Sequence, residues 1–453
     1  MQIDKLKIDY FRCFEHYEID FAQRATVLFG KNGAGKTSLI TAIHKALSFV
    51  FAKDTKDRDD LTLSAGNSML RVEGFDRKTD FMKDPDTGNA YPYISIKAMG
   101  VHEGMTLEWA METPTSTFRL TKSSYKAAFM QFINQTKETW VLPVLAYYSD
   151  GFPHVETKSK VDRSITSLRN FGYYQWNLES ACSKIWTERL ERTIKQWERL
   201  SRQKEKHEEE HSTDSTGYQK ILNELRDSHT EIESITGALR RFTQGDPFME
   251  VKELTLDSYD DKLIVVTTQG REFHFRTLPA GYKRLLYMVL DLAYRSFVLN
   301  KEVDSQGIVM IDEIDLHLHP ELEKEVLNRF LGTFPRIQFI VSTHSPMVLT
   351  NLKTYRNDCQ ILRMEAGDSR PTVVDDIYGI DYNSSVEDVM GVEARDVEID
   401  NLLGTLAFME KRQMTNQAAN VRALLLKKLG DDDTHLYKLL ERKKKEMGNE
   451  IHR

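Results

Sequence analysis

The sequence predicts an α/β fold in which a mixed sheet is flanked by helices. Apolar strand patterns fill residues 1–30 and return at 308–311 and 336–342, where each later strand runs into polar residues. A long, charged helical pattern at 184–241 separates these two groups, and mostly helical sequence follows residue 366. This order predicts one split α/β domain with a short helical insertion and a helical C-terminal appendage.

The N-terminal part predicts strands around one buried helix. The segment "IDKLKIDYF" alternates in polarity, and "EIDFAQRATVLFG" ends in an apolar run before Gly30. Residues 37–51 are apolar on nearly every side, as in a buried helix. Strand-like runs follow at "YISIKAMG", "MTLEWAME" and "STFRLTK", and "TWVLPVLAYYSDG" predicts a buried strand running into a loop. These elements form the predicted N-terminal lobe, residues 1–155.

The rest of the chain divides into three predicted parts. Residues 156–247 are the helical insertion, read as an antiparallel pair broken at "STDSTG". Residues 248–366 form the C-terminal lobe, with a hairpin turn at Asp260–Asp261 and two further buried strands. Residues 367–453 form a helical region that we expect to dock a partner.

Composition excludes several classes of protein. Of the 453 residues, 40% are hydrophobic and 29% are charged, and the net charge of −7 gives no overall attraction to nucleic acid. The three cysteines include no CxxC pair, so neither a zinc site nor a disulfide framework is indicated. We find no signal-peptide pattern and no apolar run of the roughly 20 residues that a membrane span requires. The sequence therefore predicts a cytoplasmic protein.

Residues 30–37 read GKNGAGKT and fit the pattern G-x4-G-K-[ST], between an apolar strand and an apolar helix. Glycines let backbone N–H groups turn around phosphate oxygens, and the following helix directs its positive end at them. In this pattern Lys36 reaches the β- and γ-phosphates, and Thr37 ligates Mg²⁺. The sequence predicts nucleoside-triphosphate binding by Gly30, Lys31, Asn32, Gly33, Ala34, Gly35, Lys36, Thr37 and Ser38.

Polar residues at the ends of two buried strands complete the predicted chemistry. Asp312 follows the run 308–311 and can hold Mg²⁺ opposite Thr37, while Glu313 can polarise the attacking water. His344, in "VSTHSP", can hydrogen-bond the γ-phosphate or that water. The plainer readings are an ordinary strand-end acidic pair and a core histidine. Two adjacent acids, rather than one, in a chain that also carries the phosphate loop favour ATP hydrolysis over binding alone.

The order of these motifs resembles the ABC-type ATPases of the RecF and SMC group, which includes the overcoming-lysogenization-defect nucleases. The resemblance covers residues 1–50, 140–150 and 270–350. It implies an ABC-type ATPase head with ATP and Mg²⁺ as cofactors. It also implies that Asp315 is the D-loop aspartate and that Arg12 lies near the nucleotide.

The signature and Q-loop segments depart from the group's pattern. Residues 278–283 stand at the signature loop, where Gly281 is kept but Pro279, Ala280 and Tyr282 replace the serine, first glycine and glutamine. A Q-loop glutamine is absent, and Tyr147, Tyr148 and Ser149 stand there. The group's mechanism implies a composite site in which the signature helix of one copy caps the nucleotide of another, so the working unit is a homodimer or a higher homo-oligomer.

The helical insertion and the C-terminal region distinguish members of the RecF and SMC group from one another. Residues 184–241 allow helices of about 25 to 30 residues, roughly 40 Å long, which is too short for a DNA-tethering coiled-coil arm. The segment "VVDDIYGIDYNSSVEDVMG" and the blocks "DEIDLHLHP" and "STHSPMVL" resemble the PtuA ATPases of the Septu antiphage systems, which also occur in some retrons. That resemblance implies control of an HNH-type nuclease, PtuB. In a retron setting it adds a reverse transcriptase with its RNA and DNA. It also implies direct or indirect contact with phage nucleic acid.

Two other functions remain as hypotheses. The motif set also fits a DNA-repair ATPase that binds DNA directly, and the carboxylates of 373–382 and 431–433 allow an in-cis nuclease. We interpret His317 and His319 as structural residues beside the D-loop rather than metal ligands. We interpret the basic terminus "ERKKKEMGNEIHR" as a solvated helix end. An aromatic cluster fits a core better than a docking surface, and it comprises Phe171, Tyr173, Tyr174 and Trp176.

Overall fold

A computed structural model of the chain forms two compact units, Met1–Gly379 and Ile380–Arg453, which are described separately. The described residues are 1–52, 70–149, 169–176, 183–209, 216–354, 358–375, 377–380, 397–429 and 433–449, together with positions 151, 382, 386, 389 and 390.

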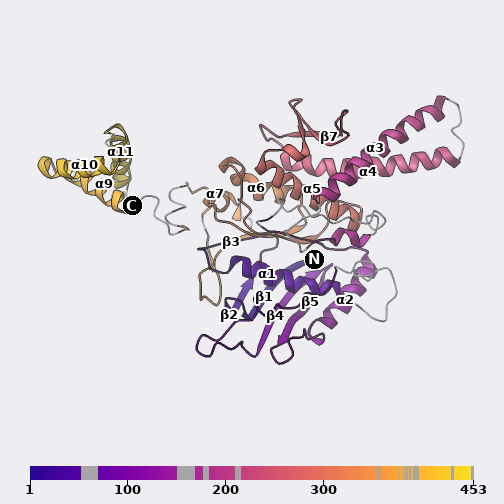
Figure 1. The fold of residues 1–453 in the computed structure, drawn as a ribbon, viewed down its shortest axis with the longest axis horizontal. Helices are drawn as coiled ribbons and strands as arrows, with labels where there is room; N and C mark the ends of the chain where they lie inside the picture. The colour runs from indigo at the N-terminus through magenta and orange to yellow at the C-terminus, as the bar shows by residue number, and fades with distance from the viewer. Residues whose placement is uncertain are drawn as a thin grey trace. The chain divides into compact units, whose positions relative to one another are not determined.

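The first unit is built around a six-stranded sheet (Figure 1). Its order is β13 (Thr372–Val373), β12 (Cys359–Arg363), β3 (Ala25–Phe29), β11 (Ile337–Ser342), β10 (Gly307–Ile311) and β6 (Val144–Tyr148). Neighbours from β12 to β6 are parallel, and β13 is antiparallel to β12. Every residue of β3, β10 and β11 is buried, as expected for inner strands covered on both faces. The predicted mixed sheet is confirmed.

A second, antiparallel sheet lies across helix α1 (Lys36–Leu47) from the central sheet (Figure 1). Its order is β2 (Phe14–Asp20), β1 (Gln2–Phe11), β4 (Tyr93–His102) and β5 (Met105–Pro114). A short 3-10 helix, η1 (Ser48–Phe51), extends α1, and α2 (Ser123–Thr139) packs on β5. The strand expected at residues 116–122 is absent, because this segment turns directly into α2.

The predicted helical pair is present as α3 (Ser183–Glu209) and α4 (Thr216–Thr243), which run side by side and project from the head (Figure 1). A small antiparallel sheet follows, in the order β7 (Val251–Leu256), β8 (Leu263–Thr267) and β9 (Glu272–His274). The remaining elements of this lobe are η3 (Arg169–Tyr173), η4 (Phe275–Thr277), α5 (Ala280–Asn300), α6 (Pro320–Thr333) and α7 (Pro346–Asn351). Nearly all of α5 is buried, so it is the central helix of this side.

The described part of the second unit includes the helices α9 (Val397–Lys411), α10 (Thr415–Lys428) and α11 (Asp433–Asn449). Their shared core is a cluster of buried leucines that includes Leu403, Leu406, Leu425, Leu436 and Leu440. Lysines near the chain end bond acids of the same unit, since Lys443 contacts Asp400 and Lys444 contacts Glu410 and Glu441. None of the helices in the described ranges is both long and apolar enough to span a bilayer.

Candidate functional site

The phosphate-loop sequence forms the turn between β3 and α1. Gly33 and Gly35 both have left-handed backbones, with φ of 85° and 96°, which only glycine adopts without strain. At Gly30 a Cβ would lie 2.2 Å from the Met364 carbonyl oxygen, so a side chain is excluded there for a second reason. The backbone demands of the turn therefore explain all three glycines of the motif.

Lys36 begins α1 and folds back over the loop. Its Nζ donates to the carbonyl oxygens of Gly30 (2.8 Å) and Lys31 (3.3 Å). Burial lowers the pKa of the Lys36 ammonium, and the negative charges of Asp312, Glu313 and Asp315 oppose that shift. The phosphate loop and the strand-end acids thus share one electrostatic environment.

Ser342 holds the two acids that follow β10. Its hydroxyl donates to Asp312 Oδ1 and accepts from the Glu313 N–H at 2.9 Å. The Asp312 N–H donates to the Tyr148 carbonyl at 2.8 Å, and the Glu313 backbone has a positive φ of 51°. This single hydroxyl fixes both residues, and no sequence motif indicated that role although Ser342 lies two positions before His344.

Asp315, the predicted D-loop aspartate, is bonded to the segment that carries His344. Asp315 Oδ1 accepts from the Thr343 hydroxyl at 2.5 Å and from the His344 N–H at 3.2 Å. The Ser345 hydroxyl donates to Glu323 on α6, and burial raises the pKa of that carboxyl. His344 itself is half-buried at the end of β11. A shift of the D-loop would therefore move the histidine with it.

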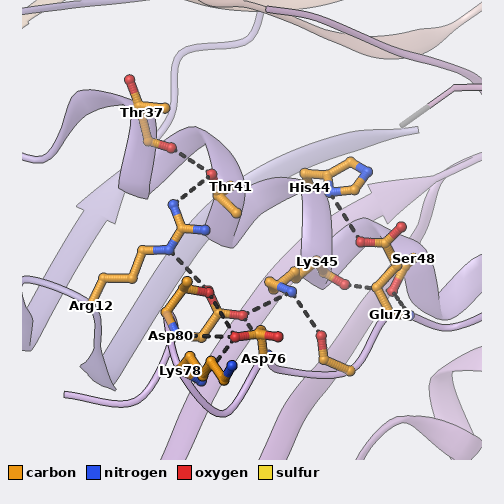
Figure 2. Close-up of polar contacts among 12 residues, drawn as sticks. Arg12, Thr37, Thr41, His44, Lys45, Ser48, Glu73, Asp76, Lys78 and Asp80 are labelled. Atoms are coloured by element: carbon orange, nitrogen blue, oxygen red, sulfur yellow. Dashed lines mark hydrogen bonds and ion pairs between the residues drawn. The ribbon is translucent and has the colours of Figure 1, made fainter. Parts of the chain in front are cut away.

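Arg12 is not free beside the phosphate loop (Figure 2). Its Nε donates to Asp80 Oδ1 at 3.0 Å and its Nη1 to the Thr41 hydroxyl at 3.2 Å, while that hydroxyl donates to the Thr37 carbonyl. Asp80 is 1% exposed and also pairs with Lys45 at 3.1 Å. The arginine thus braces the first turns of α1, and no pattern in the sequence pointed to Asp80.

The signature segment forms the start of α5, with exposed Pro279 at the N-cap and exposed Ala280 as the first helical residue. A Cβ on Gly281 would lie 3.0 Å from the His317 carbonyl oxygen, so the D-loop crosses this turn closely. Tyr282, in place of the usual glutamine, donates its hydroxyl to Asp246 Oδ1 at 2.8 Å. The same carboxylate pairs with Arg329 of α6 at 2.8 Å, which ties the signature turn to the end of α4.

Further along, α5 carries two buried charged residues that no sequence motif indicated. Arg284 is fully buried, and its Nη2 donates to the carbonyl oxygens of Asp312 (3.2 Å) and Glu313 (3.1 Å). Two turns later, Asp291 is also fully buried. A charged residue within the otherwise apolar run "LLYMVLDLAY" was the available signal.

Asp291 joins three elements of the head. It accepts from the Tyr148 hydroxyl of β6 (2.7 Å), the Trp186 indole N–H of α3 (2.6 Å) and Arg295 Nε (2.6 Å). Arg295 donates onward to the carbonyls of Gly172 and Tyr174. Tyr148, which stands near the expected Q-loop position, therefore points into this cluster.

Several other residues take the structural roles proposed for them. The side chains of Phe171, Tyr173, Tyr174 and Trp176 are all buried, so the aromatic cluster is core. His319 accepts from the Glu321 N–H and caps α6. Within the described ranges, the one group that could hold a metal is Asp257, Asp260 and His274 near the β7–β8 turn, and it contains neither His317 nor His319.

The arrangement suits a nucleoside triphosphate with Mg²⁺. Thr37 is exposed at the start of α1, whose first N–H groups lack partners within the helix. A threonine hydroxyl and the Asp312 carboxylate supply the oxygen ligands that Mg²⁺ prefers. Helix start, lysine and paired acids therefore match the charge of a triphosphate–magnesium complex.

The fold and two family patterns together identify an ATPase-family protein. The chain belongs to the AAA-domain family, whose pattern matches residues 5–245, just over half of the chain. A second pattern, described as "AAA domain, putative AbiEii toxin, Type IV TA system", matches residues 167–350.

Among curated proteins, the chain is similar to ATPases of two kinds of system. It is 44% identical to the Retron Vc95 probable ATPase of Vibrio cholerae serotype O1 biovar El Tor over 93 residues, which cover 20% of this chain and 18% of that protein. It is 40% identical to the Septu protein PtuA of Bacillus mycoides (strain KBAB4) over 75 residues, 17% of this chain and 11% of that protein. The matched segments therefore span less than a fifth of either relative. The expected relationship to Septu and retron ATPases is confirmed as a sequence similarity.

Among solved structures, the SMC head domain from Thermotoga maritima matches with a TM-score of 0.43 and 14% identity. The match covers 83% of this chain and 98% of that domain.

Proposed function

We propose that this chain is the ATP-hydrolysing, nucleotide-sensing component of an antiphage defence complex, in which it holds and controls an HNH-type nuclease. The observation that supports hydrolysis most strongly is the convergence of the Lys36 loop with Asp312, Glu313 and His344. The similarity to the Septu and retron ATPases supports the setting.

In this proposal each residue has a defined task. Lys36 and the loop amides bind the β- and γ-phosphates, and Thr37 and Asp312 hold Mg²⁺. Glu313 orients the attacking water, and His344 contacts the γ-phosphate and reports its loss through Asp315.

The signature helix completes the site of a second copy. Its start, at Ala280 and Gly281, is exposed or half-buried, so the positive end of a 21-residue helix is available to another chain's triphosphate. Hydrolysis then weakens the contact between copies, because the γ-phosphate that bridges them is lost.

The C-terminal helices are the proposed docking region for the nuclease. Large apolar side chains are exposed there, namely Phe408, Met414, Leu424 and Tyr437. Exposed apolar side chains that gather into one patch are typical of contact surfaces, so we expect the nuclease to contact these residues.

Co-purification tests the proposed partner. The chain is expressed with its neighbouring open reading frame under a single tag, and we expect the second protein to co-elute. A matched variant, Phe408→Ser/Tyr437→Ser, should lose it while retaining ATP hydrolysis. Elution of the chain alone would overturn the assignment.

Glu313→Gln tests the nucleotide cycle. Loss of the base should slow turnover by about 10² to 10⁴ and trap ATP in a stable homodimer. Size-exclusion chromatography with light scattering should then show a dimer with ATP, and none with ATP when Lys36→Ala is added. Normal turnover by Glu313→Gln would show that Glu313 is not the base.

The alternative, a repair ATPase that binds DNA directly, makes a different prediction. Purified homodimer should then bind duplex DNA with an affinity that depends on ATP and falls steeply with salt. Duplex binding unaffected by ATP would argue against it.

A further inference from the structure

A second hollow, separate from the phosphate loop, lies where η1 meets α2. Its volume is about 800 Å³, within the range of small-ligand pockets. Its lining residues are Phe51, Ala52, Arg71, Val72, Arg119, Leu120, Lys122, Tyr125, Lys126, Phe129 and Met130. None of them is acidic, although the chain as a whole carries a net charge of −7.

Four exposed cations border this hollow: Arg71, Arg119, Lys122 and Lys126. Across the part of the chain that the structure describes, none of the four pairs with an acidic side chain, whereas cations elsewhere commonly do, as Lys5 does with Glu18. Clustered cations repel one another, so an anion that binds among them relieves that repulsion.

The wall of the hollow is aromatic. Tyr125 and Phe129 are buried, and they stand one helical turn apart on α2. Lys122 and Lys126 have the same four-residue spacing on the neighbouring strip of this helix. The pocket therefore places positive charges beside an apolar wall in which only small parts of the two rings are exposed, and a base can lie against this wall while its phosphate contacts the cations.

We propose that this pocket binds a nucleotide unit, as part of a single strand of nucleic acid or as a free nucleotide. The cations contact phosphate, and the base lies against the Tyr125 and Phe129 wall. This site is independent of the nuclease partner and of the ATP-binding loop.

The test uses the chain of residues 1–453 and a fluorescein-labelled dT20 strand, without added ATP, so that no second nucleotide competes for the pocket. Fluorescence anisotropy should show binding that Lys122→Glu/Lys126→Glu weakens by at least roughly tenfold. For the neutral pair Lys122→Gln/Lys126→Gln, the negative slope of log affinity against log salt concentration should become shallower by roughly 1.4. A charge-matched control, Lys220→Glu/Lys252→Glu, changes exposed lysines outside the pocket and should bind as the wild type does.

Competition separates the two sources of the nucleotide unit. If the pocket binds a strand, unlabelled dT20 displaces the labelled probe and millimolar dTMP does not. If the pocket binds a free nucleotide, dTMP binds in a direct titration, and Lys122→Glu/Lys126→Glu abolishes that binding. Wild-type affinity for dT20 and dTMP in both pocket variants would overturn the proposal, as would no binding of either probe. Loss of a protein partner from these variants, without loss of either probe, would also overturn it.

Discussion

The phosphate loop and the signature helix differ in how closely they follow the ABC-type pattern. Loop residues 30–37 match it fully. The loop depends on its backbone, through the positive φ of its glycines and the carbonyl oxygens that accept from Lys36. The signature turn departs at Pro279, Ala280 and Tyr282, yet its helix is held by buried side chains, above all Arg284 and Asp291. Backbone geometry tolerates few substitutions, whereas a side-chain network can be rebuilt with other residues. We therefore expect loop changes to cost activity and network changes to cost stability.

Asp291→Ala should give the largest effect on stability. It leaves the buried donors of Tyr148, Trp186 and Arg295 without their acceptor, which should lower the free energy of unfolding by about 3–5 kcal/mol. Chemical denaturation measures this. The exposed control Asp304→Ala should change it by less than about 0.5 kcal/mol. An Asp291→Ala variant within about 1 kcal/mol of the wild type would contradict the proposed role of the network.

Lys36→Ala should show the opposite behaviour. Loss of the phosphate contact should reduce ATP turnover by about 10² to 10³. Stability should change by less than about 1 kcal/mol, because the two lost carbonyl contacts are offset by the relief of burying a charge. Steady-state hydrolysis and denaturation of the same preparation measure both. A well-folded variant with normal turnover would place the nucleotide elsewhere.

Arg284→Met tests the junction of the two regions, since this buried arginine of α5 bonds the carbonyls of Asp312 and Glu313. ATP turnover should fall by about tenfold, because Asp312 and Glu313 are misplaced. The free energy of unfolding should fall by about 1–3 kcal/mol, because the two carbonyls lose their donor. If only stability falls, the acids keep their positions without the arginine.

Asp80→Asn should give the smallest change. Arg12 and Lys45 lose an ionic partner but keep a hydrogen-bond acceptor, so we expect ATP affinity to weaken by only a few fold, or about 1 kcal/mol. Titration with a fluorescent ATP analogue measures it, with exposed Asp86→Asn as the control. An unchanged affinity would confine Arg12 to a structural role.

Sequence and structure agree where local patterns decide the outcome. The apolar strands, the phosphate loop at Gly30 and the helical pair of the insertion are all present. Contacts between distant segments could not be read from the sequence, because nothing local links Ser342 to Asp312 or Asp80 to Arg12. The strand expected at residues 116–122 is absent although the edge strand β5 is available beside it, because residues 115–117 form a turn and the chain then enters α2.

Mixing two inactive variants tests the composite site most directly. Lys36→Ala removes phosphate binding from its own loop, and Ala280→Asp places a negative charge at an exposed helix start, where it suits the helix but repels a partner's triphosphate. Each variant alone should be inactive. Because neither variant builds an intact site with itself, only mixed dimers are held by ATP, and one intact site of two should give the mixture up to about half of wild-type ATP turnover. Light scattering and exchange of a fluorescent label show whether mixed dimers form. If they form and the mixture is as inactive as its components, the composite site is contradicted.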